Sequence, residues 1–187
     1  MRVIAGSARG VRLSAPAGMQ TRPTADRVKE ALFSIIASQR DLAGTRVLDI
    51  CAGTGSLGIE ALSRGAAFCC FIEQERPVLA LLEKNLARTG LDNRGECLAH
   101  DAIKGLNLLS RQGKTFDIVF FDPPYSSNLY ATVPEALSSL SLLSDGGLLV
   151  AECSARIPLA ERYGMLVRID RRVYGDTVLE FFVREHP

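Results

Sequence analysis

Short apolar runs alternate with stretches of helical periodicity along most of this chain. Continuous apolar runs predict strands over residues 47–50, 68–72, 96–99, 116–121 and 147–151. Apolar positions at helical spacing predict helices over 56–63, 77–88, 103–109 and 129–140. Residues 165–169 and 178–183 read as two closing strands without a long helix between them. We therefore expect an α/β fold: a seven-stranded, mostly parallel sheet covered on both faces, with an antiparallel C-terminal edge hairpin.

The first 44 residues follow a different pattern. Val3-Ile4-Ala5 and Val11-Arg12-Leu13 flank a glycine-bearing turn, which predicts a small β-hairpin. A helix is expected through residues 28–36, capped by Thr24 or Asp26. We place the domain boundary in the linker that ends at Gly44, so residues 1–44 form an extension and residues 45–187 the main domain.

Composition restricts the cellular compartment and the cofactors that we expect for this protein. The chain has 187 residues, 47% of them hydrophobic, yet it has no apolar run long enough for a membrane span and no secretory signal. Its five cysteines are odd in number and include no Cys-x-x-Cys, which favours free thiols in a reducing cytoplasm. The two histidines lack ligand partners at useful spacing, so we expect no metal.

Positive charge is concentrated at the amino terminus. The net charge is +1, but residues 1–46 carry eight Lys or Arg against three acids, a balance of +5, and the remaining residues therefore sum to −4. Arg168, Arg171 and Arg172 form a second cluster near the carboxyl terminus. A basic extension on a mildly acidic body fits contact with a polyanion, although a solvated arginine-rich surface gives the same balance.

Asp122-Pro123-Pro124-Tyr125 is the most informative tetrapeptide, because it follows the apolar strand that ends at Phe121. Ligands of open α/β sheets bind at the carboxyl ends of strands. Pro124 supplies no N–H, so we expect the Pro123 carbonyl to point outward beside the Asp122 carboxylate. Two oxygen acceptors and the flat face of Tyr125 suit a planar amine, such as the amino group of a nucleobase.

A glycine-rich turn follows the first strand of the main domain. Gly53, Gly55 and Gly58 match the dinucleotide fingerprint G-x-G-x-x-G, and Glu73 ends the next strand, where a carboxylate accepts ribose hydroxyls. Asp49 within the turn's approach would repel a pyrophosphate and suits a cation, such as the amino-acid end and sulfonium of S-adenosylmethionine. Asp101, after the third strand, suits an adenine amino group.

These elements, in this order, resemble the class I S-adenosylmethionine-dependent methyltransferases with a Rossmann-like fold, and the Asp-Pro-Pro-Tyr box resembles their amino-methylating branch. The stretch Arg22-Pro23-Thr24-Ala25-Asp26-Arg27 resembles the bacterial 16S rRNA guanine-N2 methyltransferase family called RsmD. The opening residues 3–10 and the closing residues 174–177 match the same family, so the resemblance covers nearly the whole chain. That family often has an aromatic residue before Arg9, where this chain has Ala8.

The resemblance implies an enzyme that methylates the N2 amino group of a guanine in 16S rRNA, with S-adenosylmethionine as cofactor. It implies a monomer that acts in the cytoplasm on a small-subunit assembly particle, without a metal or membrane. The implied catalytic residues are Asp122, Pro123, Pro124 and Tyr125. The implied cofactor-binding residues are Asp49, Ala52, Gly53, Thr54, Gly55, Glu73, Gln74, Asp101, Ala102, Asp122, Thr24 and Arg27. The implied RNA-binding residues are Arg9, Arg12, Arg22, Arg171 and Arg172, with Arg27 also able to hold the RNA backbone.

Other interpretations stay open at this point. An adenine-N6 DNA methyltransferase uses the same tetrapeptide, although about 45 residues of extension are few for a separate target-recognition domain. A nicotinamide-dependent oxidoreductase would use the same glycine turn, and a non-catalytic RNA-binding module would use the same basic surface. Each motif also has a structural interpretation, since glycines make tight turns and aspartates cap helices.

Overall fold

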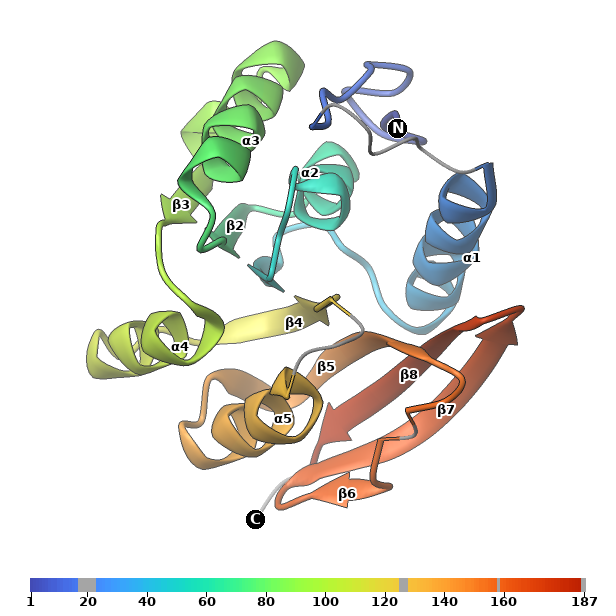
Figure 1. Cartoon of the computed structure of the whole chain (residues 1–187), viewed down its shortest axis with the longest axis vertical. Coiled ribbons are helices and arrows are strands. Elements are labelled where there is room, and N and C mark those ends of the chain that lie inside the picture. The colour runs from blue at the N-terminus through green and yellow to red at the C-terminus, as the bar shows by residue number, and fades with distance from the viewer. Residues whose placement is uncertain (17–22, 125–127, 158, 186–187) are drawn as a thin grey trace.

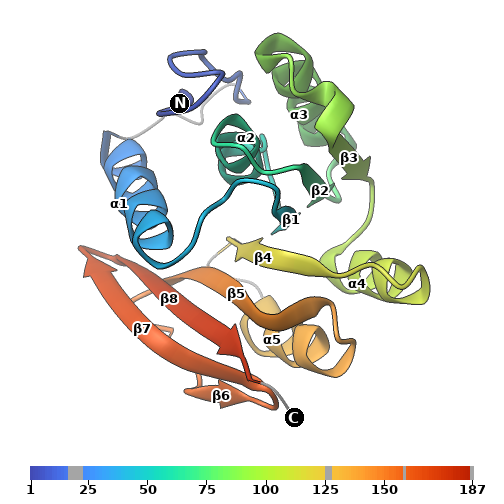
Figure 2. The same ribbon diagram turned by 180° about the vertical axis from the view of Figure 1, so that it is seen from behind.

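The computed structural model describes residues 1–16, 23–124, 128–157 and 159–185. Its sheet has the strand order β3-β2-β1-β4-β5-β8-β7-β6, in which β1 to β5 are parallel and β6 to β8 are antiparallel. Figure 1 and Figure 2 show the molecule from the front and from behind, with helices on either side of the sheet. The helices are α1 (Pro23–Gln39), α2 (Ser56–Ser63), α3 (Arg76–Thr89), η1 (Asp92–Arg94), α4 (Ala102–Arg111) and α5 (Leu129–Ser139). The strands are β1 (Arg46–Ile50), β2 (Phe68–Ile72), β3 (Gly95–Leu98), β4 (Phe116–Phe121), β5 (Leu143–Ser154), β6 (Arg162–Tyr163), β7 (Leu166–Tyr174) and β8 (Thr177–Arg184).

The central strands are buried on both faces because their apolar residues face helices in alternation. In β4, Ile118 and Phe120 pack with α1, α2 and α3, while Val119 and Phe121 pack with α4 and α5. The two helical layers lie on opposite sides of the sheet (Figures 1 and 2). The expected α/β class, with a mostly parallel sheet and antiparallel closing strands, is therefore confirmed.

The number of strands differs from the expected one. The sheet has eight strands rather than seven, because the short β6 pairs with the start of β7. The expected N-terminal hairpin is present in a minimal form, with one antiparallel bridge between Arg2 and Arg12 and a hydrogen bond of 3.0 Å from the Val3 N–H to the Val11 carbonyl. The loop between them turns through Gly6 and Gly10, both at positive φ, which glycine adopts without steric cost.

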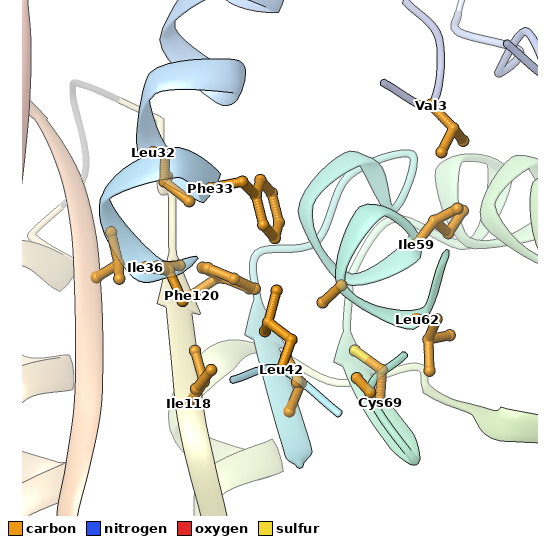
Figure 3. Packing of buried hydrophobic residues seen from close by; sticks show 14 of the residues in the cluster. Val3, Leu32, Phe33, Ile36, Leu42, Ile59, Leu62, Cys69, Ile118 and Phe120 are labelled. Carbon is orange, nitrogen blue, oxygen red and sulfur yellow. The ribbon is translucent and has the colours of Figure 1, made fainter. Parts of the chain in front are cut away.

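Helix α1 belongs to the core of the main domain rather than to a separate core of the extension. Phe33 and Phe120 pack with ring centroids 5.6 Å apart, and Leu32 and Ile36 are fully buried beside them. Figure 3 shows this cluster between α1, α2 and β4. Val3 from the extension joins the same cluster, so the boundary at residue 44 stays a prediction about organisation.

One fully buried carboxylate attaches the N-terminal segment to α2. The oxygens of Glu60 accept hydrogen bonds from the backbone N–H groups of Ile4, at 2.7 Å, and Ala5, at 3.0 Å. The same carboxylate pairs with Lys29 Nζ at 3.6 Å and with Arg64 Nε at 2.8 Å. A buried charge needs such partners, so Glu60 ties the first residues of the chain to α1 and α2.

We expect Glu60→Gln to destabilise the fold strongly. Removing one charge of a buried pair leaves the other uncompensated, which costs about 3–5 kcal/mol. Urea unfolding followed by circular dichroism measures the loss as a lower midpoint. The matched control is Glu96→Gln, because the Glu96–Lys114 pair is partly exposed and such pairs contribute roughly 0–1 kcal/mol. Equal midpoints for the two variants would contradict the anchoring role of Glu60.

Candidate active site

Strand register brings the predicted site residues together. In β1, Ile50 lies opposite Ile72 of β2 on one side and Phe121 of β4 on the other. The residues that follow these three are Cys51, Glu73 and Asp122, which therefore leave the sheet side by side. The adjacent β3 ends in register as well, since the Glu73 N–H donates to the Leu98 carbonyl at 3.1 Å. The sequence motifs thus converge on one edge of the sheet.

The glycine-rich turn begins with two residues in the left-handed region. Cys51 has φ 60° and Gly53 has φ 55°, and the turn closes through a hydrogen bond of 2.8 Å from the Gly55 N–H to the Ala52 carbonyl. The Ala52 N–H donates to the Ile72 carbonyl at 3.0 Å, which fixes the turn against β2. Thr54 is buried within the turn. Nothing lies within 4 Å of the position that a Cβ on Gly53 would take, so this backbone is open to a ligand.

Gly58 serves packing rather than ligand contact. A Cβ at this position would lie 2.3 Å from Cε1 of Phe71, because α2 runs against β2. The third glycine of the fingerprint therefore lets the helix approach the strand, as it does in other glycine-rich nucleotide folds.

Glu73 links the glycine turn to the end of β2. Its side chain is buried, with Oε2 accepting from the Gly53 N–H at 2.9 Å and Oε1 accepting from the Glu75 N–H at 2.8 Å. Each carboxylate oxygen has a second lone pair, so Glu73 keeps capacity to accept from a ligand hydroxyl. Gln74, the next residue, is exposed.

Asp49 lies beneath the turn rather than on its surface. It is 2% exposed, and its Oδ2 accepts from the Gly58 N–H at 2.9 Å. Burial raises the pKa of Asp49 well above its ordinary value, the Gly58 hydrogen bond opposes this, and the negative charges of Asp122 and Glu73 raise it further. The carboxylate thus holds the start of α2 beneath the turn, and its predicted contact with a cofactor stays a prediction.

Asp122 is an exposed residue at the end of β4. Many protein atoms nevertheless surround its carboxyl group, and the resulting desolvation raises the pKa of Asp122 to about 6. Pro123 is buried and Pro124 exposed, while Tyr125 lies outside the described residues. The Pro123 carbonyl accepts a hydrogen bond of 3.2 Å from the Tyr130 hydroxyl, a contact that the sequence did not predict. A carbonyl oxygen has two lone pairs, so one acceptor position remains on Pro123.

The thiol of Cys51 experiences the negative field of this edge. Burial raises the pKa of Cys51 to about 12, with further contributions from the charges of Glu73, Asp49 and Asp122. The charges of these three carboxylates therefore all act on one point at the start of the turn.

The remaining predicted cofactor residues are less informative. Asp101 is the N-cap of α4: its Oδ1 accepts from the Lys104 N–H at 2.9 Å, and this hydrogen bond is the main reason that the pKa of Asp101 is lowered. Ala102 behind it is buried. Arg27 lines a cavity beside the N-terminal segment, and the side chain of Thr24 lies outside the described residues.

The predicted RNA-binding arginines fall into two groups. Arg9 and Arg12 are exposed, and their guanidinium groups have no hydrogen bond or ion pair among the described residues, while Arg22 lies outside those residues. Arg171 pairs with Glu180 at 3.4 Å, and Arg172 pairs with Asp170 at 2.9 Å. The C-terminal arginines are thus partly neutralised within the protein, which makes the N-terminal ones the better candidates for a polyanion.

Two further residues escaped the sequence analysis. Tyr130 sits five positions after the tetrapeptide and contacts it, but an aromatic residue in a helix more often indicates core packing. Lys29 is buried at the start of α1, donating to the Arg2 carbonyl at 2.8 Å and to Ser56 Oγ at 3.2 Å. A lysine in an amphipathic helix gives no sequence signal for such burial.

In the part of the chain that the structure describes, no group of three or more His, Cys, Asp or Glu could hold a metal ion. No described helix has both the length and the apolar character needed to cross a membrane.

Comparisons with known proteins agree with this arrangement. The family model described as "Conserved hypothetical protein 95" matches residues 1–183. YlbH of Bacillus subtilis is 37% identical over 177 residues, 95% of each chain. Ribosomal RNA small subunit methyltransferase D of Escherichia coli K12 is 36% identical and covers 99% of this chain and 90% of its own. The solved structure of yhhF from E. coli is 32% identical with a TM-score of 0.84, covering 100% of this chain and 99% of that one. The chain therefore belongs to the RsmD family, which the matching model describes as conserved hypothetical protein 95.

Proposed function

We propose that this protein transfers a methyl group from S-adenosylmethionine to the exocyclic N2 amino group of a guanine in small-subunit ribosomal RNA. The observation that carries the proposal is the strand register that places Asp122 beside the glycine turn and Glu73. The full-length relationship to a small-subunit rRNA methyltransferase supports the choice of substrate class.

The donor set at this edge fits S-adenosylmethionine. The open backbone at Gly53 lets a ligand approach closely, and Glu73 has spare acceptor capacity for ribose hydroxyls. Asp49, Glu73 and Asp122 create a negative field that favours a cation over a pyrophosphate. The cofactor supplies the electrophilic methyl group, and the protein's part is to bind and orient the two reactants.

Asp122 and Pro123 would orient the amine. The nitrogen lone pair of a guanine amino group is delocalised into the ring, so the free amine is a poor nucleophile. Hydrogen bonds from its two N–H groups to the Asp122 carboxylate and the Pro123 carbonyl raise electron density on the nitrogen and fix its direction. Positioning of this kind contributes about 7–11 kcal/mol in well-oriented reactions.

The unpartnered N-terminal arginines would hold the RNA backbone while the target base is turned out of its stack. In the described ranges, the large apolar side chains with high exposure are Ile169 and Val173. Large exposed apolar patches mark protein interfaces, so this small number supports a monomer. We further propose that the substrate is a partly assembled small subunit in the cytoplasm.

The direct test is methylation of naked rRNA and of isolated small-subunit particles with labelled cofactor, followed by nucleoside mass spectrometry. We expect the label in N2-methylguanosine, and we expect the particles to take up more label than naked rRNA. Label recovered in N6-methyladenosine, or no transfer to either RNA substrate while S-adenosylhomocysteine binds, would contradict the proposal.

We expect Asp122→Asn to reduce kcat by at least about a hundredfold, because a charged acceptor for the amine is lost. Calorimetry should give an affinity for S-adenosylhomocysteine within a few fold of the unaltered protein, since the turn and Glu73 remain. Asp92→Asn is the matched control, because Asp92 is exposed in η1 at the opposite end of the sheet. Undiminished kcat in Asp122→Asn would remove the proposed role.

The raised pKa of Asp122 predicts a pH dependence. Below a pH of about 6 the carboxyl group is protonated and cannot accept an amine N–H through both oxygens. We expect kcat/KM to fall as the pH is lowered through about 6 and to level off above it. The residual kcat/KM of Asp122→Asn should lack this decrease at low pH, and a decrease that persists in the variant would assign it to another group.

Tyr130 acts as a positioning residue, because its hydroxyl fixes the Pro123 carbonyl. Tyr130→Phe should lower kcat several fold and leave the KM for the cofactor unchanged. The matched control is Tyr163→Phe, which removes a hydroxyl bonded to the Ala160 N–H in the C-terminal strands. Each loss should cost about 1 kcal/mol of stability, so a kcat effect shared by both variants would show that stability alone is responsible.

A further inference from the structure

A cavity of about 410 Å³ lies between the N-terminal segment and the first turns of α1. Its volume falls within the roughly 300–1,000 Å³ of small-ligand sites. Among the described residues, the cavity is lined by Arg2, Val3, Ile4, Arg9, Gly10, Asp26, Arg27 and Glu30. The described residues of the glycine turn and of the Asp-Pro-Pro-Tyr box are not part of this lining.

The charged side chains that line this cavity are not paired with one another in the part of the chain that the structure describes. Within the described ranges, the guanidinium groups of Arg2, Arg9 and Arg27 make no hydrogen bond or ion pair, and neither do the carboxylates of Asp26 and Glu30. The C-terminal arginines of β7, by contrast, pair with acids: Arg168 contacts both Glu161 and Glu180, and Arg171 contacts Glu180 as well. Among the described residues, the cavity therefore presents three guanidinium donors and two carboxylate acceptors without hydrogen bonds, and the charge of Asp26 acts on the nearby Lys29.

Charges of both signs restrict the ligand. A simple anion would be attracted by the arginines but repelled by the two carboxylates on α1. A nucleotide of single-stranded RNA carries the matching groups: a phosphate for guanidinium and, on the base, an exocyclic amine for a carboxylate. Unstacked bases also lie flat on arginine planes.

We propose that this cavity binds one unpaired nucleotide of the RNA strand, a second nucleotide in addition to the one that is methylated, whose base carries an exocyclic amino group. Arg9 and Arg2 hold the phosphate, and Glu30 accepts from the amino group. This inference rests on the proposed function for the identity of the strand, but its test does not require methyl transfer.

The wall of the cavity is connected to the cofactor end of the protein. Lys29 lies beneath it, donating both to the carbonyl of Arg2 and to Ser56 Oγ, and Ser56 is the first residue of α2 after the glycine turn. Glu60 holds Ile4, another wall residue, to α2. An RNA strand seated in the cavity is thereby placed on a rigid support shared with the turn.

The phosphate contact is tested by the salt dependence of RNA binding. The probes are fluorescently labelled oligocytidine and oligouridine 12-mers, and all proteins carry Asp122→Asn so that the contribution of the catalytic corner is reduced and is the same in every comparison. We expect Arg9→Gln to weaken binding of both probes and to reduce the slope of log K against log salt by about 0.7, the value of one single-strand phosphate contact. The control Arg111→Gln, at the exposed end of α4, should change neither quantity.

The base contact is tested by the preference between the two probes, since cytosine has an exocyclic amine and uracil has none. We expect the reference protein to prefer oligocytidine by about fivefold, the scale of a modest base contact. Glu30→Gln should abolish this preference without changing the salt slope, while the control Glu83→Gln on α3 should retain it.

The outcomes separate this inference from the proposed function. In one outcome, Glu30→Gln loses the preference for oligocytidine while the unaltered protein transfers no methyl group. That pair of results would support nucleotide binding in the cavity and overturn the methyltransferase assignment. Two results would overturn the nucleotide-binding role of the cavity alone if transfer to guanine is normal. One is an unchanged salt slope in Arg9→Gln, and the other is an unchanged preference for oligocytidine in Glu30→Gln. Either result would leave the cavity as a solvated charged groove. A reference protein without any preference between the probes would overturn it as well.

Discussion

The buried carboxylate of Glu60 holds together two parts of the chain that local structure alone would not join. Residues 1–13 have a single β-bridge and no sheet of their own, so their position depends on tertiary bonds. Glu60 receives the N–H groups of Ile4 and Ala5 while facing Lys29 and Arg64, and each of these groups would be costly to bury alone. The basic N-terminal segment is consequently a fixed surface of the protein, and its arginines have a defined relation to the helix that follows the glycine turn.

Glu60 is surrounded by positive partners, whereas at the strand ends three negatively charged side chains are brought together. Asp49, Glu73 and Asp122 follow from three separate strands, and only the parallel register makes them neighbours. Their repulsion contributes to the raised pKa of Asp49, so the site stores unfavourable interactions that a cationic ligand relieves. Backbone N–H groups from Gly53, Glu75 and Gly58 hold two of the carboxylates in place, which reduces the reorganisation needed on binding.

Much of this architecture follows from the sequence because buried parallel strands have an unambiguous pattern. The bounds of α2, β2 and β4 agree with those predicted, since each is framed by glycine, proline or charged residues. Features set by tertiary partners were missed: β6 has two residues and exists only by pairing with β7, and Tyr130 reaches Pro123 across a turn. Charge clusters were equally ambiguous, because sequence cannot distinguish the engaged Arg171 from the unengaged Arg9. The cavity beside α1 required coordinates, since its lining comes from two segments about 20 residues apart.

The thiol of Cys51 shows a consequence of building an alkylation site from carboxylates. A sulfonium is an electrophile that a thiolate would attack, and Cys51 stands at the first position of the turn that we assign to the cofactor. With a pKa of about 12 this thiol remains protonated at physiological pH, and the protonated form is a poor nucleophile. Burial of the thiol, with a further contribution from the carboxylates that attract a positively charged methyl donor, thereby protects the enzyme from modifying itself and allows a cysteine to occupy this position.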